Sequence, residues 1–173
     1  MDGVLDYAEG LDVGHRAWLR DAGRRAHDRG AARPVYWFGH GLGYTTWSYQ
    51  GLSAPERVAP GESCTIQVRL RNTGSRAGRE VVQVYLARED TNIRRPVRWL
   101  AGYASARAEP GEEVRVTVEI SARMLQHWAA GHEQAGGWRT EPGAFTLLAG
   151  RSVADLPLRA VLTVSGERSP AVL

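Results

Sequence analysis

Apolar and polar side chains alternate with a period of two through most of the chain after residue 44. Ile66, Val68 and Leu70, for example, are separated by glutamine and arginine. Successive side chains of a strand point to opposite faces, so this pattern predicts strands with one buried face. The run at 80–87 is apolar on both faces, which predicts a strand covered on both sides. The predicted strands span residues 66–71, 80–87, 114–120, 144–148 and 158–164.

Turn signals separate these runs. Pro60-Gly61, Pro110-Gly111 and Pro142-Gly143 precede strands, and Asn72-Thr73-Gly74 follows one. Such residues supply the backbone angles that tight turns require. Short strands joined by regular turns are typical of an antiparallel sandwich, and we expect an all-β sandwich over residues 45–166. Ser121 is a candidate cap for one helical turn, because the alternation stops between 121 and 128.

The first 44 residues follow a different pattern. Residues 1–33 are mostly polar, and the stretch Gly14–Gly30 predicts a marginal helix or a solvated loop that packs weakly. Residues 34–44 combine four aromatic side chains with three glycines. Glycines at this density favour tight turns, and the aromatic rings would anchor the loop on the sandwich by burying large areas. Residues 167–173 are expected to form a tail.

Composition narrows the function classes. The formal net charge is +3 and the pI is near 9.4, yet all 22 basic residues are arginines and they are scattered among 19 acids. This distribution speaks against nucleic-acid binding, which needs clustered charge. No apolar run approaches the roughly 18 residues of a membrane helix. No signal peptide is visible, which favours a cytoplasmic protein if Met1 is the natural start. Cys64, the single cysteine, lies in an alternating run and is expected to be a small buried apolar residue.

Residues 36–49, YWFGHGLGYTTWSY, carry the strongest signal in the chain. They resemble a motif of family 3 glycoside hydrolases that joins the α/β sandwich domain to a C-terminal fibronectin type III-like domain. Gly43 stands where that family more often has serine. Other stretches resemble the family in the same order along the chain, namely Tyr7–Arg16, Asn72–Gly74, Gly78–Leu86, Arg95–Tyr103, Glu141–Phe145 and Ala149–Ser152. The motif residues are Phe38, Gly39, His40, Gly41, Leu42, Tyr44, Thr45 and Thr46.

The resemblance implies an immunoglobulin or fibronectin type III-like sandwich of about seven strands, with an irregular or partly helical N-terminal extension. It divides the chain into a remnant of the α/β domain at 1–33, a linker loop at 34–44, the sandwich at 45–166 and the tail. It also implies a retaining β-glucosidase-like parent, whose Asp nucleophile lies in a barrel and whose Glu acid/base lies in the α/β domain. Neither motif occurs in this sequence, so we expect the chain alone to be inactive.

Other candidate residues favour structural roles. Glu9 lies close to Asp12 in sequence and could belong to a catalytic or sugar-contacting site. A structural role, in which Glu9 pairs with an arginine, is the favoured interpretation. His40 could act as a general base, yet it has no nucleophile or carboxylate near it in sequence, which favours a packed loop histidine. The five histidines lack metal-ligand spacing, so neither a metal nor a cofactor is expected. The glycines of 39–43 match no phosphate-binding loop.

Aromatic and basic residues remain as candidate contacts. Arg94, Arg95, Arg98 and Trp99 would form one patch, and Trp128 and Trp138 flank a glycine-rich loop. Packing between domains is the favoured role, and sugar stacking is the alternative. The sequence thus predicts a non-catalytic module whose partners are the catalytic domains of a glycosidase. Two alternatives stay open: an independent carbohydrate-binding module for β-glucosides or oligosaccharides, and a protein-interaction module.

Overall fold

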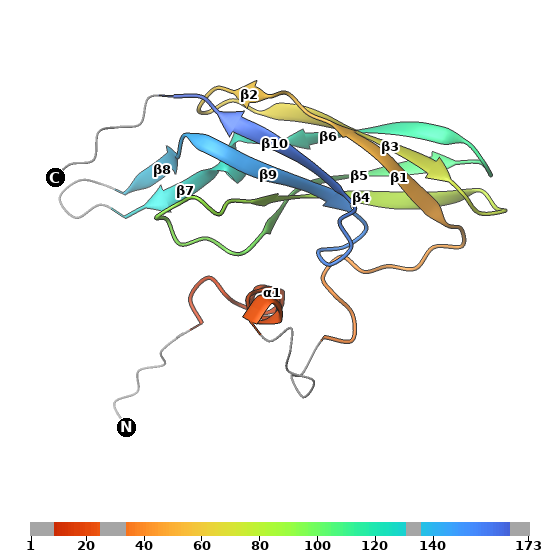
Figure 1. The fold of residues 1–173 in the computed structure, drawn as a ribbon, viewed down its shortest axis with the longest axis horizontal. Helices are drawn as coiled ribbons and strands as arrows, with labels where there is room; N and C mark the ends of the chain where they lie inside the picture. The colour runs from red at the N-terminus through yellow and green to blue at the C-terminus, as the bar shows by residue number, and fades with distance from the viewer. Residues whose placement is uncertain (1–8, 25–33, 131–135, 167–173) are drawn as a thin grey trace.

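The computed structural model describes residues 9–24, 34–130 and 136–166. Two sheets form a sandwich (Figure 1). The smaller sheet has the order β1-β3-β6 and is antiparallel, with β1 at Trp47–Ser53, β3 at Cys64–Asn72 and β6 at Glu113–Ile120. The all-β sandwich expected from the alternation is therefore confirmed.

The larger sheet has the order β2-β10-β9-β4-β5. Its strands are β2 at Arg57–Val58, β10 at Leu158–Val164, β9 at Gly143–Gly150, β4 at Gly78–Ala87 and β5 at Trp99–Ala108. Neighbouring strands are antiparallel except β2, which runs parallel to β10 and pairs with its last two residues, Thr163 and Val164. Among the described residues the sandwich has eight strands, where about seven were expected. The two residues of β2 are too few to leave a period-two signal.

The core lies between the two sheets and follows the sequence alternation. Every second side chain of β3, from Cys64 to Asn72, is buried, and the side chains between them are exposed. β6 contributes Val116, Val118 and Ile120, and β9 contributes Phe145, all at most 5% exposed. Burial of such side chains stabilises a fold by roughly 1.5–3 kcal/mol each. Cys64 is buried in this core, as predicted, and burial raises the pKa of its thiol.

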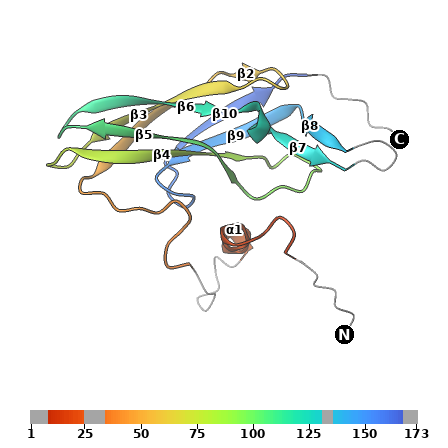
Figure 2. The same cartoon turned by 180° about the vertical axis from the view of Figure 1, so that it is seen from behind.

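A second, smaller cluster lies on the outer face of the larger sheet. Helix α1, at His15–Arg24, places Leu19 against Tyr85 of β4, which is 1% exposed. Both views of the fold show α1 and the segment 34–44 on the same side of the sandwich (Figures 1 and 2). The prediction that β4 is covered on both sides holds at Tyr85 but not at Val81, which is 44% exposed.

A short hairpin completes the described structure. A 3₁₀ turn at Ala122–Leu125 follows Ser121, whose side chain makes no capping hydrogen bond although its position is the one predicted. β7 at Gln126–Ala129 then pairs antiparallel with β8 at Gly137–Thr140. The glycine-rich residues 131–135 between them, the tail 167–173 and residues 1–8 and 25–33 lie outside the described residues. None of the described helices is long and apolar enough to cross a membrane.

Candidate functional site

The middle of the segment 34–44 is attached to the larger sheet and to the turn after β9 through Trp37, Phe38 and Gly39. Trp37 packs into the cluster of Tyr85, and the carbonyl of Phe38 accepts a hydrogen bond of 3.0 Å from the Val153 amide. The Gln83 side chain donates to the carbonyl of Gly39 at 2.8 Å. Gly39 has a φ of 82°, and a Cβ there would lie 1.9 Å from the Gln83 Oε1. Only glycine therefore allows the segment to pass so close to β4.

The rest of this segment is not packed on the sandwich. Leu42 is 89% exposed, Tyr44 is 91% exposed and Phe38 is 41% exposed. Our expectation that the aromatic rings would anchor the loop was wrong for these residues. The side chains of Leu42 and Tyr44 are directed into solvent, whereas Phe38 is partly covered by its stacking on His15. A surface loop with this much exposed apolar area is unusual in a protein that acts alone.

His40 is exposed as well, and it stacks on Tyr36 with ring centroids 4.9 Å apart. Its backbone amide donates to the Trp37 carbonyl at 2.9 Å. We expected His40 to be a packed loop histidine, but its side chain is exposed and its backbone forms part of a turn. Gly41 is also exposed. The neighbouring histidine His15 of α1 stacks on Phe38 at 4.2 Å, so the helix and the segment support each other.

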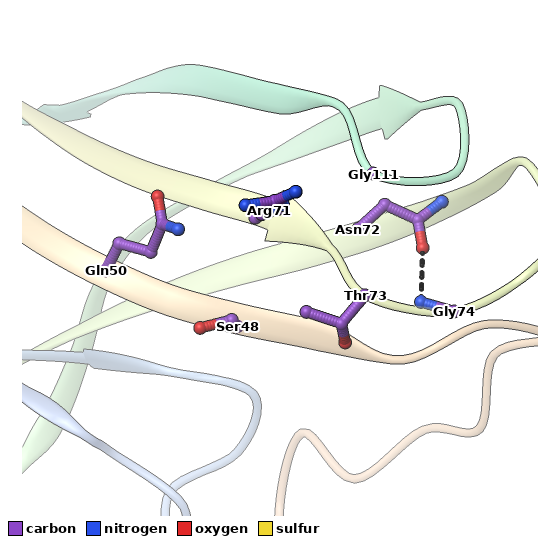
Figure 3. A pocket seen from close by; sticks show the side chains of 7 residues that line it. All are labelled: Ser48, Gln50, Arg71, Asn72, Thr73, Gly74 and Gly111. Atoms are coloured by element: carbon purple, nitrogen blue, oxygen red, sulfur yellow. Dashed lines mark hydrogen bonds between the residues drawn. The ribbon is translucent and has the colours of Figure 1, made fainter.

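Three of the motifs identified in the sequence meet at the end of the segment. Thr45 donates to the Asn72 Oδ1 at 2.6 Å, and side chains at Gly74 or Gly78 would clash with Thr45. Asn72 is fully buried, and its amide donates to the carbonyls of Arg76 and Ala108. An open concavity lies beside this turn (Figure 3). Ser48, Gln50, Arg71, Asn72, Thr73, Gly74 and Gly111 line it, and none of these is a carboxylate. The geometry is that of a structural turn.

The N-terminal extension is held by an ion-pair cluster. Asp12 accepts from Arg20 at 2.7 Å and from Arg94 at 3.2 Å. Burial alone would raise the pKa of Asp12, but hydrogen bonds from Arg94 and Arg20 outweigh it and hold the pKa below its ordinary value. Glu9 is exposed. Residues 9–24 are thus packed more firmly than we expected for this region, and Asp12 rather than Glu9 is the carboxylate paired with arginine.

Three arginines of the loop between β4 and β5 contact three different parts of the chain. Arg94 reaches Asp12, Arg95 reaches Glu141 at 3.3 Å, and Arg98 donates to the Val153 carbonyl at 3.0 Å. The loop thereby ties the N-terminal extension, the base of the hairpin and the turn after β9 together. This arrangement differs from the single exposed patch that the sequence suggested.

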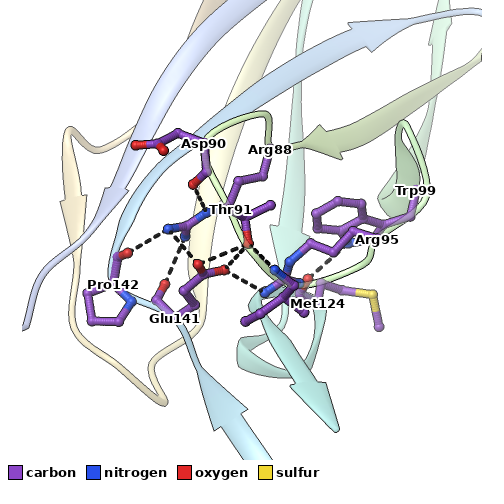
Figure 4. A network of polar contacts seen from close by, with 9 residues as sticks. Arg88, Asp90, Thr91, Arg95, Trp99, Met124, Glu141 and Pro142 are labelled. Atoms are coloured by element: carbon purple, nitrogen blue, oxygen red, sulfur yellow. Dashed lines mark hydrogen bonds and ion pairs between the residues drawn. The ribbon is translucent and has the colours of Figure 1, made fainter. Parts of the chain in front are cut away.

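Glu141 is the centre of a polar network at the end of the sandwich (Figure 4). Its carboxylate pairs with Arg88 at 3.4 Å and Arg95 at 3.3 Å, whose side chains are only 5% and 7% exposed. The Thr91 hydroxyl lies 2.8 Å from the same carboxylate. Trp99 donates to the Met124 carbonyl at 2.9 Å. Arg95 and Trp99 are therefore turned into the domain, and sequence patterning missed Arg88 and Glu141 because an ion pair between distant residues leaves no periodic signal.

Trp128 and Trp138 face each other across the hairpin. They are directly paired in the β7–β8 register, and their rings meet edge to face with centroids 5.4 Å apart. The Arg123 guanidinium lies 3.4 Å from the Trp138 ring centroid, a cation–π contact. The two rings remain 55% and 47% exposed. Of the four candidate contact residues, the structure brings Trp128 and Trp138 together at the surface and uses Arg95 and Trp99 internally.

Within 9–24, 34–130 and 136–166, no group of three or more histidine, cysteine or acidic side chains could hold a metal ion. Asp12 and Glu141 are each engaged by two arginines, which is the arrangement of structural ion pairs.

Comparison with known proteins gives a consistent set of relatives. The fibronectin type III-like domain family matches residues 80–153. The chain is 32% identical over 165 residues to the thermostable β-glucosidase B of Acetivibrio thermocellus, which covers 95% of this chain and 20% of that protein. It is 34% identical over 158 residues to a β-glucosidase of Rhizobium radiobacter, covering 90% of this chain and 18% of the relative.

Solved structures agree in fold. The crystal structure of DesR, a β-glucosidase from Streptomyces venezuelae in complex with D-glucose, superposes with a TM-score of 0.80 at 33% identity. It covers 95% of this chain and 20% of that one. The GH3 β-glucosidase of Bifidobacterium adolescentis gives a TM-score of 0.77 at 27% identity, covering 96% and 23%. The chain thus spans about a fifth of the length of the relatives it matches.

Proposed function

Because the chain is homologous to the C-terminal region of family 3 β-glucosidases and carries a fibronectin type III-like domain, we propose that it is a non-catalytic module of a β-glucosidase-like glycoside hydrolase. Its role would be to pack against the catalytic domains and to stabilise them. In the relatives, the matched region is part of the same chain as the catalytic domains. We further propose that residues 9–24 and 34–44 form the side of the module that meets them.

The observation that carries this proposal is the exposed apolar surface of the segment 34–44. Besides Leu42 and Tyr44, it leaves Val35 at 86% and Tyr36 at 69% exposure. On the extension, Val13 is 61% exposed, and helix α1, which follows it, lies on the same side of the sandwich as the segment (Figures 1 and 2). Large contiguous apolar patches on a domain mark interaction sites, because leaving them in water costs roughly 25 cal/mol per Å². A neighbouring domain would cover this surface.

Catalytic silence is tested with the purified chain and an aryl β-glucoside. No turnover above the rate of buffer is expected, because the sequence holds neither the nucleophile motif nor the acid/base motif of the family it resembles. Turnover by the chain alone would overturn the non-catalytic assignment.

Docking is tested in trans with a β-glucosidase B of A. thermocellus that lacks its matched region. We expect the chain to raise the thermal stability of that truncated enzyme, and the double variant Leu42→Asp, Tyr44→Asp to lose the effect. The matched control is Thr117→Asp, an exposed position on β6 in the opposite sheet. Equal stabilisation by the double variant and the wild type would show that the segment is not the docking surface.

A further inference from the structure

The outward face of the β7–β8 hairpin combines an aromatic pair with polar groups. Directly opposed residues of an antiparallel pair share one face, as do residues two apart. Trp128 and Trp138 therefore lie on the same face as the pair Gln126 and Thr140. Arg123 joins this face, since its guanidinium contacts the Trp138 ring and lies 3.4 Å from the Gln126 Oε1.

The opposite face of the hairpin carries the pair His127 and Arg139, of which Arg139 is exposed. His127 belongs to that face, and its Nδ1 is buried. Burial, followed by the charge of Arg95, lowers the pKa of its imidazole. At the base of the hairpin, Glu141 is held by the buried Arg88 and Arg95. The direction in which Trp128 and Trp138 point is therefore fixed by contacts on the other side of the hairpin.

The two indoles meet edge to face at the surface, with different parts of each ring left exposed. Their planes meet at 68°, so one ring can lie flat under a ligand while the other closes one side. Arg123 covers one face of Trp138, and Gly136 lies so close to the Trp128 ring that a Cβ there would be 2.9 Å from its Cζ2. Trp128 remains the more exposed ring, at 55% against 47%. The face of an aromatic ring carries negative charge density and attracts partially positive hydrogens. A β-glucopyranoside offers such hydrogens, because its equatorial hydroxyls leave axial C–H bonds on both faces of the ring.

The size of the face decides between a sugar and a protein as its occupant. Two strands of four residues, with a rise of about 3.3 Å per residue and a spacing of about 4.8 Å, cover only about 130 Å². A specific protein interface buries about 800 Å² on each partner. The hairpin face is therefore several-fold too small for a protein partner alone, whereas it matches one or two pyranose rings. Its amide, hydroxyl and guanidinium groups are hydrogen-bonding partners suited to sugar hydroxyls.

We propose that the exposed Trp128–Trp138 pair is a contact site for neutral β-glucosyl oligosaccharides, separate from the docking surface proposed at 34–44. Trp128 would stack on a pyranose ring, Trp138 would form the side wall, and Arg123, Gln126 and Thr140 would hydrogen-bond to its hydroxyls. The site needs no catalytic domain, so its test is independent of the proposed docking role.

The experiment follows the indole N–H signals of the ¹⁵N-labelled, 19.0 kDa chain while cellotetraose is added. The signals are assigned by through-bond experiments, so that the result does not depend on a variant that folds. We expect saturable shifts at Trp128 and Trp138 in the millimolar range, and none with sorbitol. Trp128→Ala should weaken binding at least tenfold. The matched control Trp18→Ala, on α1 and 39% exposed, should bind as the wild type does.

Four results would overturn the proposal. The first is the absence of shifts, and the second is an equal shift at Trp18, which would indicate non-specific stacking. The third is a response to oligogalacturonate only, which would make Arg123 an anion site rather than part of a neutral-sugar site. The fourth is a shift of the Trp128 and Trp138 indole signals with protein concentration in the absence of sugar, since a second copy of the chain would then contact the two rings.

Discussion

Replacement of Glu141 by alanine tests whether the polar network at the end of the sandwich stabilises the fold. The variant removes the carboxylate that faces Arg88 and Arg95, whose side chains are 5% and 7% exposed. Breaking a buried ion pair on one side costs about 3–5 kcal/mol, because a desolvated charge loses its partner. Glu141 is itself 22% exposed, and Arg88 keeps its hydrogen bonds to the carbonyls of residues 141 and 142. We therefore expect a cost somewhat below this range, about 2–3 kcal/mol.

The assay is urea unfolding of the chain, followed by circular dichroism, with a thermal melt as a second measurement. For a protein of this size, a loss of about 2–3 kcal/mol corresponds to a fall in Tm of roughly 4–12 °C. The matched control is Glu113→Ala, which breaks the pair with Arg69 at 3.6 Å, where both side chains are 47% exposed. An exposed pair of this kind contributes less than about 1 kcal/mol. If Glu141→Ala costs no more than Glu113→Ala, the burial argument is refuted.

Three further variants probe other parts of the structure. Gly39→Ala should cost about 1 kcal/mol more in urea unfolding than Gly61→Ala, because both positions have positive φ but only a Cβ at 39 would clash, and equal costs would argue against the close approach. Burial, followed by neighbouring arginine charge, lowers the pKa of His127 in the folded protein. The contribution of the neutral His127 side chain to the unfolding free energy should therefore be complete above the unfolded pKa of about 6.5, and it should decline as the pH falls toward the folded pKa. His127→Gln should remove that part of the pH dependence of the unfolding free energy, and an unchanged slope would contradict it. Leu42→Ser with Tyr44→Ser should reduce the binding of an apolar dye while changing stability by less than about 0.5 kcal/mol, since both side chains are almost fully exposed, and a large destabilisation would show that they are packed.

The period-two pattern predicted the sandwich well because each core strand buries one face. Ile66, Val68 and Leu70, which the alternation placed inward, are all fully buried. The pattern also indicated that the strand carrying Tyr85 is covered on both sides, although it could not show that α1 is the covering element. Local side-chain alternation carries this information because it follows directly from strand geometry.

Sequence reasoning failed where a residue's environment depends on distant partners. An aromatic side chain such as Tyr44 looks like a core residue in sequence, but its burial requires a second layer, and the described residues supply none. Arg95 looked like part of a surface patch, but Glu141, 46 residues further along, draws it inward. For the candidate contacts, the sequence supplied Trp128 and Trp138 as neighbours of one loop, while their facing register and the cation–π contact from Arg123 required the structure.

The two-residue strand β2 affects how copies of this domain behave at high concentration. β10 would otherwise present a free row of backbone donors and acceptors at the edge of the larger sheet, and such edges recruit strands from other molecules. Instead, the amides of Thr163 and Ser165 donate to the carbonyls of Glu56 and Val58, both at 2.9 Å. Pro55 and Pro60 flank this short strand and lack the amide hydrogens with which a further strand could pair. β2 therefore blocks strand addition at the Thr163–Val164 end of β10, and weakening it should promote intermolecular β-sheet formation at that end.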